Sequence, residues 1–248
     1  MHMRPAQFIY TGLIAALSGG CATGTHPEDP FEAANRRIYR FNESVDKAVV
    51  APTARAYRAV LPQFVRGSVT NFFSNLRDVR TGLNNALQGK LTTAYSDFGR
   101  VAINSTLGIV GLFDIASEAG IEKHEEDFGQ TLGRWGVPTG PFLMLPILGP
   151  SSVRDFAGSI VDFKTDPVAY VDPVHNRNQL QGLRFVDRRA ELLDASKVLH
   201  AAALDEYEFV RDGYLQRRRT LSYDGKPPKG KEEKEPLDIN SVDKKPAR

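Results

Sequence analysis

Apolar residues recur every three or four positions along most of the chain, a pattern typical of helices with one buried face. The longest stripe predicts a helix over residues 65–88, and the last one predicts a long helix over 178–218 that breaks near Phe185. Because no segment alternates convincingly between apolar and polar residues, the sequence predicts an all-α fold with one domain, residues 29–221. Shorter stripes predict further helices over 31–48, 53–60, 92–106 and 153–165.

Several predicted helices carry recognisable end signals. Asp29 is expected to cap the first helix, with Pro30 at the first helical position. Gly89 follows the longest stripe and is expected to end that helix. Ser151 or Ser152 is expected to cap the helix that begins at the next apolar stripe. These signals place three helix boundaries independently of the stripes.

Two apolar segments do not have the pattern of an amphipathic helix. Residues 107–116 leave almost no polar face, which predicts a short helix buried in the core or lying horizontally in a membrane, since it is too short to span one. Residues 127–155 are apolar in the middle but contain prolines and glycines throughout, which disfavour a regular helix or a central strand. We expect this second segment to be irregular, and either buried, lining a cavity or lying at a membrane interface.

The first 20 residues are typical of a secretory signal peptide. A positive charge at Arg4 precedes an apolar run over residues 6–17, and small residues then lead into Cys21. This arrangement resembles a bacterial lipobox, although Ser18 stands where leucine is usual, and it predicts lipidation of Cys21 with residues 21–28 as a tether. An ordinary signal peptide with an incidental cysteine is the alternative. Because the chain has one cysteine, an intramolecular disulfide is excluded.

Charge and hydropathy limit the possible partners. Thirty-two basic and thirty acidic residues give a net charge of +2, and no basic block interleaves with aromatic residues, so no nucleic-acid partner is expected. A mean hydropathy of −0.33 indicates that any membrane contact is local. Residues 222–248 are rich in charge and proline, and we expect them to be disordered.

The sequence offers little for catalysis. It has no nucleophile-elbow, P-loop or zinc-protease motif, and its five histidines do not pair at metal-binding spacing, so we expect no enzyme activity, no metal and no cofactor. A triad built on Ser151 or Ser152 is disfavoured against helix capping. For residues 217–219, three arginines, a solvated helix end is favoured over phosphate binding. Asn35 and Asn42 lie seven residues apart beside an apolar stripe, and they either join helices together or face a polar channel.

A set of short motifs follows in order over residues 29–175. The motifs are Asp29-Pro30-Phe31-Glu32, Asn35-Arg36, Tyr39, Phe41-Asn42, Pro62-Gln63, Val65-Arg66, Asn71-Phe72-Phe73, Asn75-Leu76, Gln88-Gly89-Lys90, Arg100, Asn104-Ser105-Thr106, Gly108, Gly111-Leu112-Phe113-Asp114, Asp127-Phe128-Gly129-Gln130-Thr131-Leu132-Gly133, Gly140-Pro141, Leu145-Pro146, Gly149-Pro150-Ser151 and Arg154-Asp155. Together they resemble the MlaA (VacJ) family of outer-membrane lipoproteins. The resemblance implies a ring of amphipathic helices around a polar channel, embedded in the periplasm-facing leaflet of the outer membrane.

The same resemblance implies a transport activity without bond-making chemistry. Phospholipids misplaced in the outer leaflet are removed and passed to a soluble periplasmic carrier, which maintains lipid asymmetry, and the protein associates with trimeric porins. A porin-associated structural lipoprotein that moves nothing is the main alternative, and a lipid hydrolase is a third.

The resemblance also points to two groups of site residues. Asn35, Tyr39, Phe41 and Asn42 are expected near the channel, where they contact lipid. A hairpin that gates the channel is expected over residues 135–141. Pro138 departs from the family, in which glycine usually continues the turn, and this bears on how mobile the turn is. The hairpin residues are Trp135, Gly136, Pro138, Gly140 and Pro141.

Overall fold

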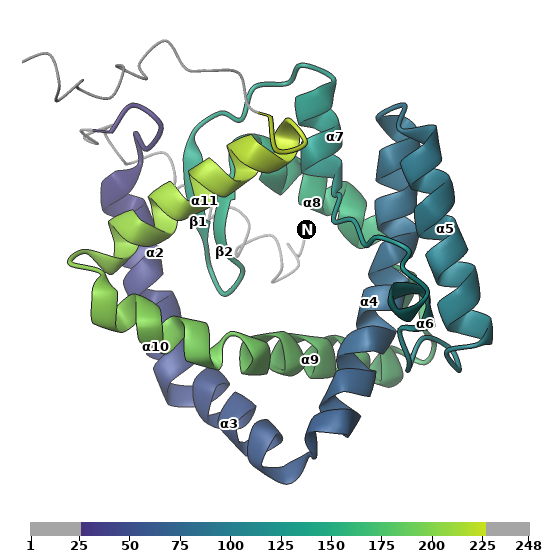
Figure 1. Cartoon of the computed structure of the whole chain (residues 1–248). Coiled ribbons are helices and arrows are strands. Elements are labelled where there is room, and N and C mark those ends of the chain that lie inside the picture. The colour runs from purple at the N-terminus through teal and green to yellow at the C-terminus, as the bar shows by residue number, and fades with distance from the viewer. Residues whose placement is uncertain (1–25, 227–248) are drawn as a thin grey trace, which may run out of the picture.

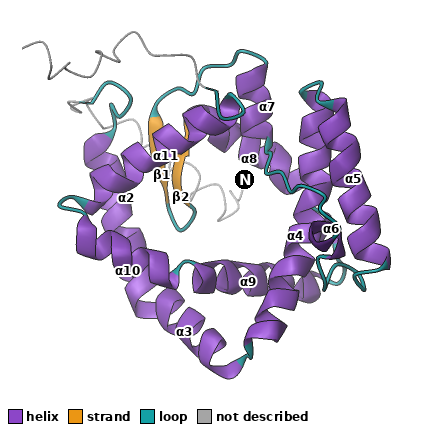
Figure 2. Cartoon of the chain, viewed as in Figure 1, coloured by secondary structure: helices purple, strands orange, loops and turns teal. Residues whose placement is uncertain are grey.

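Helices follow one another around a central opening in the ribbon of the computed structural model, which describes residues 26–226 (Figure 1). A single two-stranded hairpin lies on the inner side of this ring, and the remainder of the described chain is helix, turn and loop (Figure 2). The predicted signal peptide 1–20, the lipidation site Cys21 and the tail beyond residue 226 lie outside the described residues. Within residues 26–226, none of the helices is both long and apolar enough to cross a membrane.

The first helical arm is almost continuous. It comprises α2 (Glu32–Val45), the π-helical turn η1 (Asp46–Val50) and α3 (Ala51–Val60), so the predicted interruption before residue 53 is reduced to one wide turn. Pro52 falls at the start of α3, where a missing N–H costs little. The predicted cap at Asp29 is wrong, because Phe31 occupies that position and Asp29 is fully buried.

The predicted long helix and its neighbour form an antiparallel pair. Helix α4 spans Gln63–Leu87 and α5 spans Leu91–Thr106, close to the ranges that the apolar stripes predict. Gly89 joins them with φ +79°, a left-handed conformation that glycine adopts without strain, as the sequence predicts.

Residues 107–116 do not form the predicted apolar helix. The backbone of Ile109, Val110 and Gly111 has positive φ values of 51°, 58° and 85°, which an α-helix of L-residues excludes. A Cβ on Gly111 would lie 2.7 Å from the Asn75 side chain, so the loop packs tightly on α4. Helix α6 is therefore a single turn, Ile115–Glu118, and the apolar residues before it form an exposed loop.

Residues 127–155 are more regular than the prolines and glycines suggest. Helix α7 (Phe128–Arg134) is followed by an antiparallel hairpin of β1 (Phe142–Leu145) and β2 (Gly149–Ser152), in which Phe142 pairs with Ser152. Phe142 and Met144 are buried while Leu143 and Leu145 are less so, an alternation too short to be evident in the sequence. Ser152 caps α8 (Val153–Thr165), as predicted, by accepting a hydrogen bond from the Asp155 N–H.

The C-terminal elements complete the ring. The short 3-10 helix η2 (Pro167–Tyr170) leads into α9 (Val174–Glu191), α10 (Leu193–Ala202) and α11 (Glu206–Ser222). The predicted break near Phe185 is wrong, because α9 continues to Glu191 and the breaks lie at Leu192 and at residues 203–205. Helix α9 contacts α3 and α4, and α11 returns to contact α7 and β2.

Candidate functional site

The α4–α5 pair is built with its polar side chains inside and its apolar side chains outside. Tyr95 on α5 is 82% exposed, and Leu83 and Leu87 on α4 are 42% and 50% exposed, although they belong to the stripes that predict these helices. Helix α8 likewise exposes Phe156, Ile160 and Phe163. In water such stripes would be buried, so the pattern suits an apolar environment around the ring.

Hydrogen bonds and ion pairs take the place of an apolar core between these helices. Asn85 donates to Asp97 at 2.7 Å, with both side chains almost completely buried. Arg100 is fully buried and reaches both carboxylate oxygens of Asp114 at 2.9 and 3.1 Å. These contacts satisfy polar groups that would otherwise be costly to bury, and they fix the loop at residues 107–113 on the pair.

A cavity of about 610 Å³ lies on the inner side of the ring, between α2, the hairpin turn, α9 and α10. Tyr39 and Asn42 contribute polar groups to it. Most of its wall area is apolar, as in a site for an amphiphilic molecule, and the remaining polar lining residues are Glu43, Asp46, Arg188, Arg189, Ser196 and His200. The apolar lining residues are Val45, Val50, Met144, Ile147, Leu148, Pro150, Phe185, Leu192, Leu199 and Val210.

The two asparagines predicted near the channel hold the hairpin. Asn35 donates to the Phe142 carbonyl at 3.1 Å and accepts from the Met144 N–H at 2.9 Å. Seven residues later, Asn42 donates to the Leu145 carbonyl and accepts from the Ile147 N–H, at 2.9 and 2.8 Å. The two amides therefore pair with the free edge of β1 much as a neighbouring strand would.

The four predicted channel residues take different positions. Asn42 and Tyr39 line the cavity, and the Tyr39 hydroxyl donates to Glu206 at 3.1 Å. Asn35 is 2% exposed beneath β1 and Phe41 is 51% exposed, and neither belongs to the cavity lining. In the sequence, the signal common to Asn35 and Asn42 was their spacing of two helical turns. In the structure, this spacing lets both amides bind the backbone of the hairpin.

Residues 135–141 connect α7 to β1 and precede the observed hairpin. Trp135 is half-exposed, and its indole N–H donates to the Leu87 carbonyl at 3.2 Å. Gly136 and Gly140 have φ values of 91° and 70°, so both turns depend on glycine, with Pro138 between them and Pro141 leading into β1. Gly136 and Pro138 line a second cavity of about 600 Å³, whose far wall is α11.

Arg218 closes the ring and is not the solvated helix end that the sequence suggests. It contacts Asp127 at 2.5 and 2.9 Å and Asp155 at 2.8 and 2.9 Å, and its side chain is 10% exposed. Burial alone would raise the pKa of both carboxyls, but the hydrogen bonds and charge of Arg218 outweigh it and hold both pKa values below the usual range. Helix α11 is thereby tied to the starts of α7 and α8.

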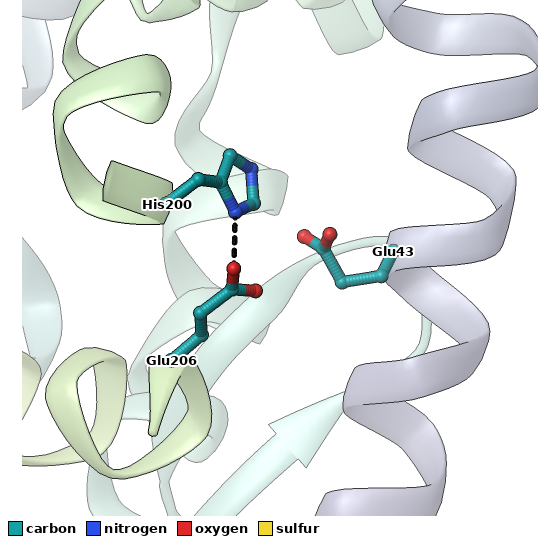
Figure 3. Close-up of side chains that lie close together, drawn as sticks. All are labelled: Glu43, His200 and Glu206. Atoms are coloured by element: carbon teal, nitrogen blue, oxygen red, sulfur yellow. Dashed lines mark hydrogen bonds and ion pairs between the residues drawn. The ribbon is translucent and has the colours of Figure 1, made fainter. Parts of the chain in front are cut away.

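A charged group lies at the rim of the large cavity (Figure 3). His200 Nδ1 lies 2.6 Å from Glu206 Oε1, and the ligand atoms of Glu43, His200 and Glu206 lie within 4.8 Å of one another, close enough to share a metal ion. However, Lys47 lies 3.0 Å from Glu43 and the Tyr39 hydroxyl donates to Glu206. Glu206 is therefore satisfied by Tyr39 and His200, and these contacts tie α2 to α10 and α11, whereas Glu43 is paired in charge with Lys47 but its buried Oε2 has no hydrogen-bond partner.

Comparison with known proteins gives one consistent result. A family model described as MlaA lipoprotein matches residues 27–221. The intermembrane phospholipid transport system lipoprotein MlaA of Escherichia coli K12 is 34% identical over 216 residues, covering 83% of this chain and 84% of the relative. The protein of the same name from Haemophilus influenzae is 30% identical over 241 residues, covering 90% and 94%.

A solved structure supports the same relationship. The chain superimposes with a TM-score of 0.70 and 32% identity on a chain from work described as "Structural basis for maintenance of bacterial outer membrane lipid asymmetry". The similarity covers 78% of this chain and 98% of the solved one. The predicted ring of amphipathic helices is thus confirmed in both sequence and fold.

Proposed function

Because the chain belongs to the MlaA lipoprotein family, as a component of intermembrane phospholipid transport, we propose that phospholipid passes through the inner cavity of its helical ring. The protein takes phospholipid misplaced in the outer leaflet of the outer membrane and delivers it to the periplasmic side, which maintains lipid asymmetry.

One observation carries the proposed route. The ring exposes apolar stripes on α4, α5 and α8, and it also encloses a cavity of about 610 Å³ that combines apolar walls with the polar groups of Tyr39 and Asn42. A phospholipid has about 30 chain methylenes at ~0.8 kcal/mol each, so exposing its chains to water costs on the order of 24 kcal/mol. A protein that lies in lipid and has an amphipathic cavity avoids this cost, because the acyl chains stay in apolar surroundings while the phospholipid headgroup remains solvated.

The outer surface supports a position within one leaflet. No described helix spans a membrane, and the apolar loop at residues 107–113 exposes Leu107, Val110 and Phe113 by 69%, 62% and 50%. We infer that this loop and the stripes contact acyl chains of the periplasm-facing leaflet, and that a lipidated Cys21 anchors the chain there. A trimeric porin is the proposed neighbour in the membrane, and a soluble periplasmic carrier is the proposed acceptor.

Each site residue then has a proposed role. Tyr39 and Asn42 contact the passing lipid, while Asn35 keeps the hairpin in place beneath them. Residues 135–141 act as a gate at the second cavity, which Gly136 and Pro138 line, with Pro138 limiting their motion. Phe41 contacts lipid from the outer side of α2. Catalysis is not part of the proposal, since passage through a cavity needs no bond to be made.

Narrowing the cavity tests this route. Ser196 lines the cavity from α10, whereas the next residue, Lys197, is exposed and does not. In a strain lacking the native gene, the Ser196→Trp variant is expected to leave phospholipid in the outer leaflet, while Lys197→Trp restores asymmetry as the unaltered chain does. Labelling of outer-leaflet phospholipid in intact cells is the measurement.

Two results would contradict the proposal. If both tryptophan variants restore asymmetry fully, lipid does not use this cavity. If the unaltered chain fails to restore it, the protein is a porin-associated scaffold that moves no lipid. Release of fatty acid from phospholipid by the purified chain would instead favour a hydrolase.

A further inference from the structure

Four arginines gather where α4 crosses α9 inside the ring. Arg77 and Arg80 come from α4, and Arg184 and Arg188 come from α9. They line a cavity of about 260 Å³ that is distinct from the two described above. Spacings of three and four residues place each pair on one face of its helix, so both helices direct positive charge into the same space.

The carboxylates nearby account for two of the four charges. Arg184 pairs with Asp166 at 2.6 Å, and Arg80 lies 3.6 Å from Asp162. Among residues 26–226, the structure shows no hydrogen bond or ion pair to the side chain of Arg77 or Arg188, and the Arg77 Nε is buried without a partner. The buried Nε atoms of Arg77 and Arg80 thus retain donors without a hydrogen-bond partner, which is costly unless an anion is bound, and the exposed Arg188 has a guanidinium group that no carboxylate neutralises.

Two further carboxylates line the same cavity. Asp187 is buried and accepts hydrogen bonds from the Tyr57 hydroxyl at 2.8 Å and the Thr70 hydroxyl at 3.0 Å, so its oxygens are already occupied. Glu191 is exposed at the end of α9. The structure shows no ion pair between either of them and Arg77 or Arg188, although the negative charge of Glu191 has a small raising effect on the pKa of Arg188.

Arg188 lines the cavity at the crossing of α4 and α9. Its side chain is accessible to water, yet enough protein surrounds it that burial lowers its pKa, and the like charge of Arg77 lowers it further. Smaller effects come from Glu125, which precedes α7, and from Arg217 on α11, on the opposite side of the opening (Figure 1).

Arg188 also borders the large apolar cavity. The same residue lines both the 260 Å³ cavity and the 610 Å³ cavity, whose walls include Phe185, Leu192 and Leu199 on the same α9–α10 face. The guanidinium group of Arg188, which has no carboxylate partner, therefore lies next to a largely apolar cavity. This combination fits a molecule with an anionic head and a hydrocarbon tail.

We propose that Arg77 and Arg188 bind the phosphate group of a phospholipid inside the ring, with its acyl chains against the apolar walls of the adjoining cavity. Guanidinium groups match phosphate oxygens with two parallel hydrogen bonds, and a bound phosphate relieves the repulsion between the two arginines. This proposal rests on the proposed function and adds which group of the lipid is recognised, and where.

Binding of defined lipids to the purified full-length chain in a non-ionic detergent tests the site. The probes are phosphatidylglycerol with a photoreactive acyl chain, diacylglycerol with the same chains, and inorganic phosphate. The test variant is Arg77→Gln/Arg188→Gln. Its matched control is Arg37→Gln/Arg55→Gln, which removes the same charge from two exposed positions that line none of the described cavities.

We expect the affinity for phosphatidylglycerol to fall about tenfold for each arginine removed, with diacylglycerol binding unchanged and the control variant equal to the unaltered chain. Equal phosphatidylglycerol affinity in the test and control variants overturns the inference and leaves lipid passage standing. If inorganic phosphate displaces phosphatidylglycerol at equimolar concentration, the ligand is free phosphate and the lipid assignment is wrong. If the unaltered chain binds no lipid, the inference and the proposed function fail together.

Folding is monitored separately. Because Arg77 and Arg188 have no carboxylate partner, removing them is expected to leave the melting temperature unchanged or raise it. If the glutamine pair unfolds, Arg77→Lys/Arg188→Lys retains the charge and loses the paired hydrogen bonds. We expect it to bind phosphatidylglycerol several-fold more weakly than the unaltered chain, and equal binding would contradict guanidinium recognition.

Discussion

Replacing Asn35 by aspartate should destabilise the hairpin in a pH-dependent way. The Asn35 amide nitrogen donates to Asp29 Oδ1 at 2.8 Å and to the Phe142 carbonyl at 3.1 Å, while its oxygen accepts from the Met144 N–H. Aspartate has the same shape and keeps the acceptor. It loses both donors and places a second carboxylate beside Asp29, which is fully buried.

The magnitude follows from these contacts. The donor bond to the Asp29 carboxylate is worth about 1.5–3 kcal/mol and the bond to the carbonyl about 0.5–1.5 kcal/mol. Two carboxylates at hydrogen-bond distance repel each other and raise the pKa of one of them. We therefore expect Asn35→Asp to lower the free energy of unfolding by about 4 kcal/mol at neutral pH.

The sign of the pH effect distinguishes repulsion between the two carboxylates from simple loss of a hydrogen bond. The introduced carboxyl has a folded-state pKa above its unfolded value, so its protonation favours the folded state, and stability should recover as pH falls from 8 towards 5. The free energy of unfolding is measured at pH 8 and pH 5 by chemical unfolding of the full-length chain in detergent, monitored by far-UV circular dichroism.

Two control variants make the test specific. Asn35→Leu removes the same hydrogen bonds without adding charge, so its loss of stability should show no such recovery. Asn42→Asp loses one bond, to the partly buried Leu145 carbonyl, and should cost about 1 kcal/mol. If Asn35→Asp and Asn42→Asp cost the same, or if Asn35→Asp does not recover at pH 5, then Asn35 does not join α2 to the hairpin as described.

Three further predictions concern the rest of the ring. Arg218→Met should lower the free energy of unfolding by about 3–5 kcal/mol, because Asp127 loses its ion-pair partner and Asp155 keeps only Arg154. It should also weaken the loss of stability below pH 4 that the lowered pKa values of Asp127 and Asp155 give the unaltered chain, and acid unfolding curves of the two proteins measure this. Gly111→Ala, with φ +85° and the Asn75 side chain 2.7 Å from the added Cβ, should lower the melting temperature, whereas Gly67→Ala in open space on α4 should raise it. Cys21→Ser should abolish palmitate labelling and release the chain from the membrane fraction, and labelling that survives would exclude this residue as the lipid anchor.

The sequence predicts where most helices lie but not which side of them faces the interior. The stripe containing Leu83 and Leu87 places α4 within two residues at its start and one at its end, because periodicity marks a helix whatever surrounds it. The assumption that the apolar side is buried fails for α4 and α5, where Asn85, Asp97 and Arg100 are inside. In lipid the two faces exchange roles, and periodicity alone does not distinguish these cases.

Two local structures were missed for a different reason. The loop containing Ile109 and Val110 takes left-handed conformations that β-branched residues rarely adopt, and contacts outside the loop hold it there, notably the Arg100–Asp114 pair and the packing of Gly111 on Asn75 of α4. The hairpin has four residues in each strand, too few for an alternating pattern to be recognised. Its support by Asn35 and Asn42 was visible as a spacing, but the sequence left open whether the amides join elements or face a channel.

The distribution of polar groups explains why one ring needs several separate polar networks. A small apolar core, in which Phe142, Met144 and Tyr207 form one cluster, cannot hold a ring together when apolar side chains are directed outward to lipid. Buried pairs such as Arg100 with Asp114, and Arg218 with Asp127, therefore maintain the shape, and each has its partners in place. Arg77 and Arg188 differ because they lack such partners. In a ring whose buried arginines are neutralised to preserve the fold, the half-buried Arg77 and the exposed Arg188, which are not neutralised, are the groups left free to bind what passes through.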